Sequence, residues 1–538
     1  MKNPNRTLWL FLLLAAALFL PAYLINLDMV QLIRDEAIRA IVAFEMLQSG
    51  DFVTPTISGE LYLNKPPVFN WIIAFFFWIT GSYSETVIRL PVIVSIVFFA
   101  LTIFYFTRKE FGPHIALINA LAFVTYGRII FYESLHGLID VTFSWLTYSF
   151  FMLSWHFFQK KKFFLLFMVA YAITAISYLL KGMPSLYFTA ASLLVLFIQG
   201  KNFRMLLNWR HFAGIFLLIL IVGGYYLLYF TRNTIEPGQV LDVLTGEVTR
   251  RTVVRFGIWN TFLHLLTYPF ENIYHFLPWS LLVIVLFRKD SIRRIRQNPF
   301  LWYCLLLFIV NIIPYWTSPE AYARYILMLI PLIMTVFLAL YFAYRKEGLR
   351  IVRWVDAILG AMIGVGIVSG IIFMLHPETK HLPYIIWVSL LLTLSLGIVL
   401  FFYRKQAYHR FLWLAIGLLI FRLAFNFSII PSWERSHPAV PTRSMAIELA
   451  EQTADKPLMI YWNPYFQPDR YFHYRYNNEI FTYYLSTARE EIIRIGQKPI
   501  PGIYFIAQWE HIKHEDFKVI RELDPVWQTP VLLIEFNQ

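Results

Sequence analysis

The sequence predicts a polytopic α-helical membrane protein with a small α/β domain at its C-terminal end. Three observations carry this prediction. Of the 538 residues, 58% are hydrophobic and only 15% are charged, whereas soluble domains average about 25% charged residues. Apolar runs long enough to cross a bilayer recur along residues 1–432. The loops between these runs alternate between basic and acidic character, and residues 433–538 lose the long runs altogether.

The first apolar run follows the short basic segment KNPNR. Because the run is long enough to span a bilayer and lacks a small-residue cleavage signal, we expect a retained transmembrane helix rather than a signal peptide. The predicted spans number thirteen: 7–27, 86–107, 112–130, 138–158, 163–180, 183–199, 212–230, 272–287, 299–316, 322–344, 354–375, 383–403 and 411–431.

The loops predict the orientation of these spans. Short basic loops occur at 107–112, 159–162, 199–211, 287–297, 344–353 and 403–410. Under the positive-inside rule they face the cytoplasm together with the N-terminus, and an odd number of spans puts the C-terminal domain in the periplasm. This distribution also explains the net charge of +13 without nucleic-acid binding. The one cysteine, Cys304, lies in a predicted span, so the chain forms no internal disulfide.

Two regions outside these spans have their own predicted structure. The segment 68–80 is apolar but too short to cross, so we expect a helix that lies at the interface or re-enters the membrane. In the C-terminal domain, 443–452 and 486–497 are predicted helices, and 457–462, 502–508 and 530–537 are predicted buried strands. The predicted domains are therefore 1–432, with the first outer loop at 28–85, and 433–538.

Unusual polar residues gather in the loops predicted to face outward. They are Asp35, Glu36 and Lys65 in the first loop, Glu133, His136 and Asp140 in the second, Lys181 in the third, Arg250, Arg251, Arg255 and His264 in the fourth, and Glu320 and Arg324 in the fifth. Acids and bases that converge on one membrane face indicate a site for an anionic substrate resident in the membrane. Asp35 and Glu36 begin a predicted interfacial helix, so capping of the positive helix end is the structural alternative for both.

These residues belong to an ordered series of short motifs. The first loop contains Asp35-Glu36, Ile38-Arg39-Ala40, Gly50-Asp51-Phe52, Gly59-Glu60-Leu61-Tyr62, Lys65-Pro66-Pro67 and Trp71. The series continues with Arg89-Leu90-Pro91, Asp140, Lys181-Gly182 before Pro184, Phe276-Leu277-Pro278-Trp279, and Arg324-Tyr325 before Pro331. In this order and spacing, the series resembles the GT-C glycosyltransferases of the aminoarabinose transferase and protein O-mannosyltransferase superfamily over about the first 340 residues.

The resemblance implies a fold, a reaction and a set of site residues. The fold is the GT-C fold, with about thirteen transmembrane helices and interfacial helices at the outer face. The reaction is transfer of a sugar from a polyprenyl (undecaprenyl) phosphate donor to an acceptor at the periplasmic face of a bacterial inner membrane, the acceptor being a lipid A-type lipid or, alternatively, a protein. The implied catalytic residues are Asp35, Glu36 and Asp140; those for the donor phosphate are Lys65, Lys181, Arg255, Arg324 and Tyr325; and Tyr62 and His264 contact substrate or metal.

A metal cofactor and a transport function are the two alternatives that the motifs leave. Family members often have a glutamate directly before the Lys-Pro-Pro lysine, near a metal, whereas this chain has Asn64. A divalent metal ion is therefore a candidate cofactor without an assigned ligand set. The alternative from another class is a transporter or flippase of lipid-linked sugars, which places ionisable residues near the membrane midplane. Only Arg422, with Asn426, falls at that predicted depth.

Overall fold

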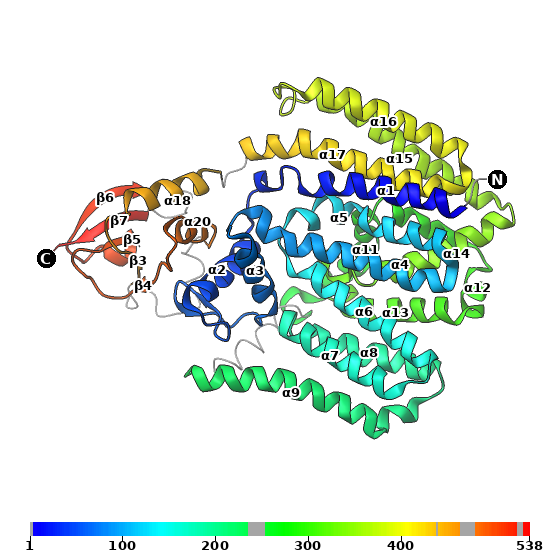
Figure 1. The fold of residues 1–538 in the computed structure, drawn as a ribbon, viewed down its shortest axis with the longest axis horizontal. Coiled ribbons are helices and arrows are strands. Elements are labelled where there is room, and N and C mark those ends of the chain that lie inside the picture. Colours follow the sequence, from blue (N-terminus) through cyan, green and yellow to red (C-terminus); the bar gives the residue numbers. More distant parts are fainter. Residues whose placement is uncertain (1–3, 235–252, 437–439, 463–478, 524–530, 538) are drawn as a thin grey trace. The chain divides into compact units, whose positions relative to one another are not determined.

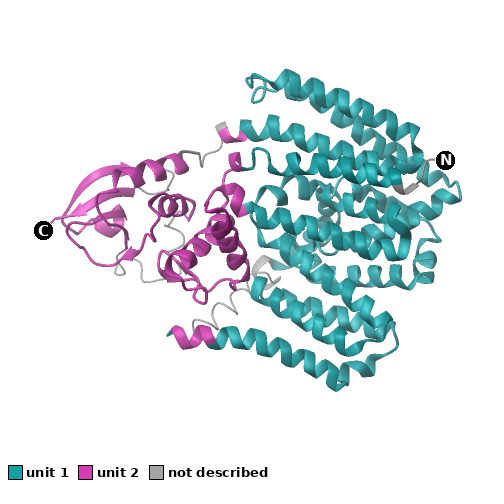
Figure 2. Ribbon diagram, in the orientation of Figure 1, with its two compact units in different colours: residues 1–27, 89–227, 234–432 teal, residues 28–88, 228–233, 433–538 magenta. Residues whose placement is uncertain are grey.

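The protein, described by a computed structural model, forms two compact units (Figure 2). The structure describes residues 4–234, 253–436, 440–462, 479–523 and 531–537. Unit 1 comprises 1–27, 89–227 and 234–432, and unit 2 comprises 28–88, 228–233 and 433–538. By its contacts, the first outer loop groups with the C-terminal residues. The predicted division of the chain at residue 432 stays a prediction.

Unit 1 is a bundle of helices (Figure 1). The α-helices that lie wholly or mostly in unit 1 are α1 (Pro4–Leu24), α4 (Glu85–Val124), α5 (Gly127–Phe131), α6 (Ile139–Gln159), α7 (Phe163–Lys181), α8 (Pro184–Gln199), α9 (Trp209–Arg232), α11 (Val253–His275), α12 (Ser291–Gln297), α13 (Pro299–Trp316), α14 (Ile330–Lys346), α15 (Arg350–Leu375), α16 (Ile385–Lys405) and α17 (Arg410–Ser436). The start of α4 and the ends of α9 and α17 belong to unit 2. Its 3-10 helices are η2 (Glu133–Leu135), η3 (Phe203–Leu207), η4 (Trp279–Phe287), η5 (Ala323–Ile326) and η6 (Ala407–His409).

Most predicted spans coincide with one helix each, and the chain is a multi-pass membrane protein. Within the described residues, eight helices are long and apolar enough to cross a membrane. One of these eight includes α4, which joins two predicted spans across a kink where Gly112 has φ 80° and Pro113 follows. Glycine adopts this left-handed backbone without a Cβ clash, so the kink falls at a residue suited to it. The count of thirteen spans stays a prediction.

Three predicted segments of unit 1 differ from the structure. The predicted span 322–344 is divided, because η5 covers Ala323–Ile326 and α14 begins at Ile330. The predicted span 272–287 is no continuous α-helix, because α11 ends at His275 and η4 begins at Trp279, after Pro278. Proline cannot donate the backbone hydrogen bond that would continue the helix. The predicted fourth outer loop, which lies between the predicted spans 212–230 and 272–287, contains most of α11. Its residues 235–252, including Arg250 and Arg251, lie outside the described residues.

Arg422 and Asn426 on α17 hold the end of α1. Arg422 donates from Nε to the carbonyl oxygen of Ala22 at 3.0 Å, and Asn426 donates to the carbonyl oxygens of Ala22 and Ile25 at 2.9 and 3.0 Å. The last carbonyls of a helix have no partner within the helix and need one elsewhere. These contacts give the two polar residues a structural role, which weakens the argument for a transporter that rested on Arg422.

Unit 2 begins with η1 (Leu27–Met29), α2 (Arg34–Ser49), the hairpin of β1 (Thr56–Ile57) and β2 (Glu60–Leu61), and α3 (Val68–Thr80). The 13-residue α3 confirms the predicted short helix. Glu45 of α2 holds the hairpin: its carboxylate accepts hydrogen bonds from Thr56 Oγ1 at 2.7 Å, the Ser58 amide at 2.5 Å and the Gly59 amide at 3.2 Å. Burial raises the pKa of Glu45, and these hydrogen bonds oppose that effect.

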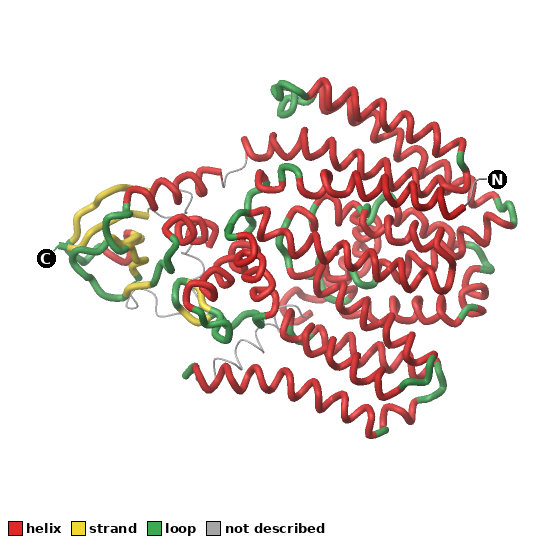
Figure 3. The backbone as a smooth tube through the Cα atoms, viewed as in Figure 1, coloured by secondary structure: helices red, strands yellow, loops and turns green. Residues whose placement is uncertain are grey.

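The rest of unit 2 is the predicted small α/β domain. It contains α18 (Val440–Gln452), β3 (Leu458–Tyr461), α20 (Glu479–Arg489), β4 (Ile495–Gly496), β5 (Tyr504–Gln508), α21 (Trp509–Ile512), β6 (Phe517–Leu523) and β7 (Val531–Phe536). All strands of the described chain belong to unit 2 (Figure 3). The five-stranded sheet has the order β4-β3-β5-β7-β6; β3 pairs in parallel with β4 and β5, and β7 pairs antiparallel with β5 and β6.

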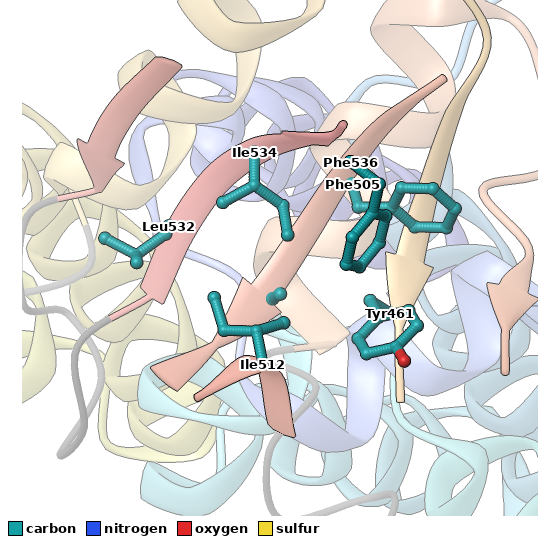
Figure 4. Close-up of a cluster of buried hydrophobic side chains, with 7 residues drawn as sticks. Tyr461, Phe505, Ile512, Leu532, Ile534 and Phe536 are labelled. Atoms are coloured by element: carbon teal, nitrogen blue, oxygen red, sulfur yellow. The ribbon is translucent and has the colours of Figure 1, made fainter. Parts of the chain in front are cut away.

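Alternating side chains on these strands form a buried core (Figure 4). Phe505 of β5 and Ile534 and Phe536 of β7 point to one face, as the two-residue period of a strand requires. The predicted helix 486–497 is wrong after its first four residues, because the helix ends at Arg489 and residues 495–496 pair with β3. Strand β6 was not predicted; only one of its seven residues is buried, so it lacks the apolar pattern of a buried strand.

Candidate functional site

Three of the predicted site residues in unit 1 meet in a buried ion cluster. Asp140 in the first turn of α6 accepts a hydrogen bond from Lys181 Nζ, at the end of α7, at 2.5 Å. The other carboxylate oxygen of Asp140 lies 3.6 Å from Arg324 Nε of η5. The Lys181 and Arg324 side chains are 12% and 13% exposed. Residues separated by 41 and 184 positions from Asp140 are thus brought to one carboxylate.

Aromatic rings enclose the cations of this cluster. Lys181 Nζ lies 4.5 Å from the ring centre of Tyr325 and 5.0 Å from that of Phe143, and the Arg324 guanidinium lies 5.6 Å from the Tyr325 ring. Cations at these distances are attracted to the ring faces. Tyr325, predicted as a phosphate contact, therefore lies beside both cations.

A second ion pair lies next to the first. Arg128 of α5 donates from Nε to Glu133 Oε1 at 2.7 Å, and its guanidinium stacks 3.8 Å from the centre of the Tyr132 ring. Glu133 is fully buried, and its Oε2 accepts no hydrogen bond from the described part of the chain. Glu133 interacts electrostatically with both Asp140 and Arg324. We refer to Arg128, Glu133, Asp140, Lys181 and Arg324 as the ion cluster.

The electrostatics of the ion cluster favour an anion. Burial raises the pKa of Glu133 to about 7; Arg128 opposes this effect, and the charge of Asp140 adds to it. Three cations therefore face one carboxylate and one carboxyl group that holds its proton up to neutral pH. A buried excess of positive charge is costly unless an anion compensates it. The arrangement is suited to bind a phosphate through charge-assisted hydrogen bonds.

The acidic pair of the first loop is divided between two environments in unit 2. Asp35 is exposed, whereas Glu36 is fully buried and accepts a hydrogen bond from the Ile33 amide at 3.1 Å. This contact is the helix-capping role that the sequence left as the alternative for Glu36. The neighbouring Arg34 binds Glu479 of α20, with its Nη2 at 2.6 Å from the carboxylate. Of the pair, only Asp35 faces solvent.

Tyr62 and Lys65 follow the β1–β2 hairpin of unit 2. Tyr62 is buried, and its hydroxyl accepts a hydrogen bond from Arg39 Nη2 at 3.2 Å. The Nη1 group of Arg39 is also buried and finds no acceptor among the described residues. Lys65 is half-buried ahead of Pro66 and Pro67. Arg39 belongs to the motif Ile38-Arg39-Ala40. Its burial with an Nη1 group that lacks an acceptor in the described chain makes it a candidate for substrate contact, and this burial could not be predicted from the sequence.

The remaining candidates lie on α11. His264 is buried, and its Nε2 lies 3.2 Å from the carbonyl oxygen of Tyr315, which favours a structural role. Arg255 lies in the first turn of α11, and its side chain is outside the described residues. Within the described ranges, no group of three or more His, Cys, Asp or Glu side chains forms a metal site. The structure therefore gives a candidate metal ion no ligand set.

Comparison with known proteins supports the predicted resemblance. The family model described as dolichyl-phosphate-mannose-protein mannosyltransferase matches residues 64–226, which include Lys65, Asp140 and Lys181. An uncharacterized protein of Aquifex aeolicus is 24% identical over 285 residues, which is 52% of this chain and 54% of that protein. The undecaprenyl phosphate-alpha-4-amino-4-deoxy-L-arabinose arabinosyl transferase of Edwardsiella ictaluri is 28% identical over 115 residues, 21% of this chain and 20% of that enzyme. The matches thus span about half of the first relative and a fifth of the second.

Solved structures confirm the fold along the whole chain. ArnT from Cupriavidus metallidurans bound to undecaprenyl phosphate has a TM-score of 0.67 and 16% identity, covering 99% of this chain and 98% of that one. The same protein in the apo state has a TM-score of 0.68 and 17% identity, covering 98% of both chains. The protein therefore has the ArnT-like GT-C fold, in agreement with the sequence resemblance.

Proposed function

We propose that this protein is a glycosyltransferase that moves a sugar from a polyprenyl phosphate donor to an acceptor at the periplasmic face of a bacterial inner membrane. The observation that carries the proposal is the ion cluster, in which three cations face two carboxyl groups at a buried site. The family-model match and the fold shared with an undecaprenyl-phosphate-bound protein support the same donor class.

In this proposal, Lys181 and Arg324 bind the donor phosphate. The bond between the anomeric carbon and the phosphate oxygen breaks, a bond from that carbon to an acceptor oxygen forms, and polyprenyl phosphate leaves. Cations next to the phosphate stabilise the negative charge that develops on it as it leaves. The buried aromatic wall of Tyr325 and Phe143 lowers the local dielectric, which strengthens this effect.

Carboxylates supply the other half of the chemistry. Transfer passes through an oxocarbenium-like state, which a nearby carboxylate stabilises, and a hydroxyl acceptor gives its proton to a base. Asp140 is the carboxylate of the ion cluster, and we assign it to orient Lys181 and Arg324 around the phosphate. Asp35, the exposed member of the first-loop pair, is the candidate base; Lys65 and Arg255 are further candidates for the phosphate.

The preferred acceptor is a lipid A-type lipid, and a protein is the second candidate. The likeness to the arabinosyl transferase of Edwardsiella ictaluri supports an undecaprenyl-phosphate-linked donor and names no acceptor, so the lipid acceptor rests on the motif resemblance, whereas the family model names protein mannosylation. Each likeness covers less than a third of this chain. The acceptor must therefore be determined by experiment.

Mass spectrometry of lipid A and polyprenyl phosphate fractions tests the proposal. Cells would express the native chain, Asp140→Asn, Asp35→Ala or the control Asp356→Asn at equal membrane levels. Asp356 is a matched control because it is also a largely buried aspartate paired with an arginine, Arg410, but lies outside the ion cluster. We expect a sugar-sized mass on lipid A that persists in the control and disappears in the two variants.

Two other outcomes are informative: one identifies a different acceptor, and the other contradicts the reaction. An unmodified lipid A together with a sugar-modified envelope protein would replace the lipid acceptor by a protein. A lack of any sugar transfer, with donor accumulation equal in native and Asp140→Asn cells, would contradict the glycosyltransferase proposal.

A further inference from the structure

A groove of about 990 Å³ lies in unit 1 where α1, α4 and the start of α17 meet, and none of its residues belongs to the ion cluster. Its lining residues come from three segments: Thr7 to Leu14 of α1, Phe111 to His114 at the α4 kink, and Gln406 to Trp413. The kink at Gly112 turns α4 at the place where the groove forms. The sequence places the two basic loops 107–112 and 403–410 at the same end of the bundle.

Two histidines line this groove with unsatisfied nitrogen atoms. His114 is 7% exposed, and its Nε2 has no hydrogen-bond partner among the described residues. The Nδ1 of His409 is likewise buried and without a partner in the described chain. The two ring centres are 5.4 Å apart, and Tyr408 stacks on His114 at 4.1 Å. An unsatisfied buried polar group costs about 1–3 kcal/mol, so paired examples in one groove indicate a ligand that supplies the partners.

The charges around these histidines favour an anionic group. Arg108 and Lys109 precede the lining residue Phe111, and Arg404 and Lys405 precede the lining residue Gln406. Arg345 at the end of α14 interacts electrostatically with both imidazoles. The acids on the same segments are Glu110, next to Phe111, Glu347, which is paired with Arg294, and Asp356, which is paired with Arg410. Cations therefore outnumber acids at this end of the groove.

The other end of the groove is apolar and open. Leu10 and Leu14 of α1 line it and are 60% and 40% exposed, on a helix apolar enough to cross the membrane. Phe11 and Trp413, whose rings lie 5.2 Å apart, form its wall. A ligand that fits both ends has an anionic head and a hydrocarbon chain.

We propose that this groove binds a membrane phospholipid, with its phosphate at His114 and His409 and its acyl chain along Leu10 and Leu14. An imidazole N–H of this pair donates to a phosphate oxygen, and the basic residues of the two loops compensate the phosphate charge. Because the groove shares no residue with the ion cluster, this binding is independent of the proposed sugar transfer.

Native mass spectrometry of the purified full-length protein tests the phospholipid site. The protein would be titrated with phosphatidylglycerol, with diacylglycerol, which has the chains without the phosphate, and with inorganic phosphate. We expect one phosphatidylglycerol to bind at least tenfold more tightly than diacylglycerol and to persist in excess inorganic phosphate. The double variant His114→Phe/His409→Phe keeps the aromatic stack but loses the nitrogens, so its affinity for phosphatidylglycerol should fall at least tenfold.

The control is His156→Phe, which alters a partly exposed histidine near the end of α6 and should leave the affinity within twofold. If the double variant fails to fold, as judged by its melting temperature, Ala407→Trp fills the groove instead and should also lower the affinity at least tenfold. Equal binding of phosphatidylglycerol and diacylglycerol, displacement by inorganic phosphate, or equal affinity in native and altered protein would each overturn the proposal.

Discussion

Units 1 and 2 both bring acids and bases together, but they use them for different purposes. In unit 2, the buried glutamates are engaged in holding the fold: Glu36 caps α2, Glu45 holds the hairpin, Glu479 pairs with Arg34, and Glu85 accepts from Tyr484 at 2.7 Å and pairs with Arg443 at 3.0 Å. In unit 1, the ion cluster has more cations than carboxylates, and one oxygen of Glu133 has no partner among the described residues.

This difference distinguishes the acidic residues that stabilise the fold from those that are candidates for substrate binding. A carboxylate whose oxygens are satisfied by backbone amides and one arginine has little capacity left for a substrate. A buried cluster with surplus positive charge and an unsatisfied oxygen is incomplete without a ligand. The motif-rich first loop is therefore built largely as structure, and the ion cluster is the stronger candidate for donor binding.

The largest expected effect comes from the centre of the ion cluster. Asp140→Ala leaves Lys181 and Arg324 buried without their carboxylate, so we expect a loss of about 3–5 kcal/mol in the free energy of unfolding. Sugar transfer per folded molecule should fall by at least about 100-fold, the scale seen when an oriented charge-stabilising group is removed. The transfer assay and thermal melts measure the two effects, and normal transfer by the folded variant would remove the ion cluster from the mechanism.

A second variant probes the scaffold in unit 2. Glu45→Ala removes the acceptor of three hydrogen bonds in the hairpin, including that of the buried Ser58 amide. We expect the free energy of unfolding to fall by about 1–3 kcal/mol, because a buried donor is left unsatisfied. Transfer should fall only with the folded fraction. If transfer per folded molecule were lost while stability was unchanged, the distinction between the two units would fail.

Glu133→Gln tests the role of the ion cluster by changing how stability and donor affinity depend on pH. The pKa of about 7 in the folded protein lies above the ordinary value of 4.5, so the folded state holds this proton more tightly than the unfolded state. Stability from this group is therefore present at low pH and is lost as pH rises from about 4.5 to about 7. The glutamine variant should lack that slope in melting temperature. Its donor affinity should also stay constant above pH 7, where the native protein gains a negative charge and binds the phosphate less tightly.

The smallest effect is expected at Asp51, a half-exposed acid of unit 2. Burial acts to raise its pKa, but the amides of Val53 and Thr54 and the charge of Arg232 together lower it. Its stabilising contribution is thus present near neutral pH and is lost as pH falls through the lowered pKa. Asp51→Asn keeps an oxygen for the turn and loses the half-exposed ion pair, so the free energy of unfolding should change by about 0–1 kcal/mol. Urea unfolding at pH 7 measures this, and a change of several kcal/mol would give Asp51 a larger role.

Much of the helical fold could be predicted from the sequence because long apolar runs and basic loops are direct consequences of the membrane. The prediction of 138–158, for example, matches α6 at Ile139–Gln159. Short elements were harder to predict, since whether they form a helix or a strand depends on partners distant in sequence. Residues 495–496 form β4 only because they pair with β3, and the exposed β6 is held in place by β7.

The sequence predicted several residues of the candidate site but not which of them contact one another. Asp140 and Lys181 stood out because they are charged residues at the ends of apolar spans, yet nothing in the sequence shows that they touch. Glu133 was one of several acids on the predicted outer face, and its importance comes from burial, which a single sequence does not reveal. An arginine five residues before a glutamate in a short loop was the only available signal of their ion pair.

The most direct test of the central claim is the affinity of the purified protein for undecaprenyl phosphate. Lys181→Met and Arg324→Met each remove one cation of the ion cluster, whereas Arg34→Met removes the partner of Glu479 in unit 2 as a matched control. If the ion cluster binds the donor phosphate, the first two variants weaken binding at least tenfold and Arg34→Met changes it less than twofold. Unchanged binding in Lys181→Met and Arg324→Met, with both proteins folded, would contradict the account.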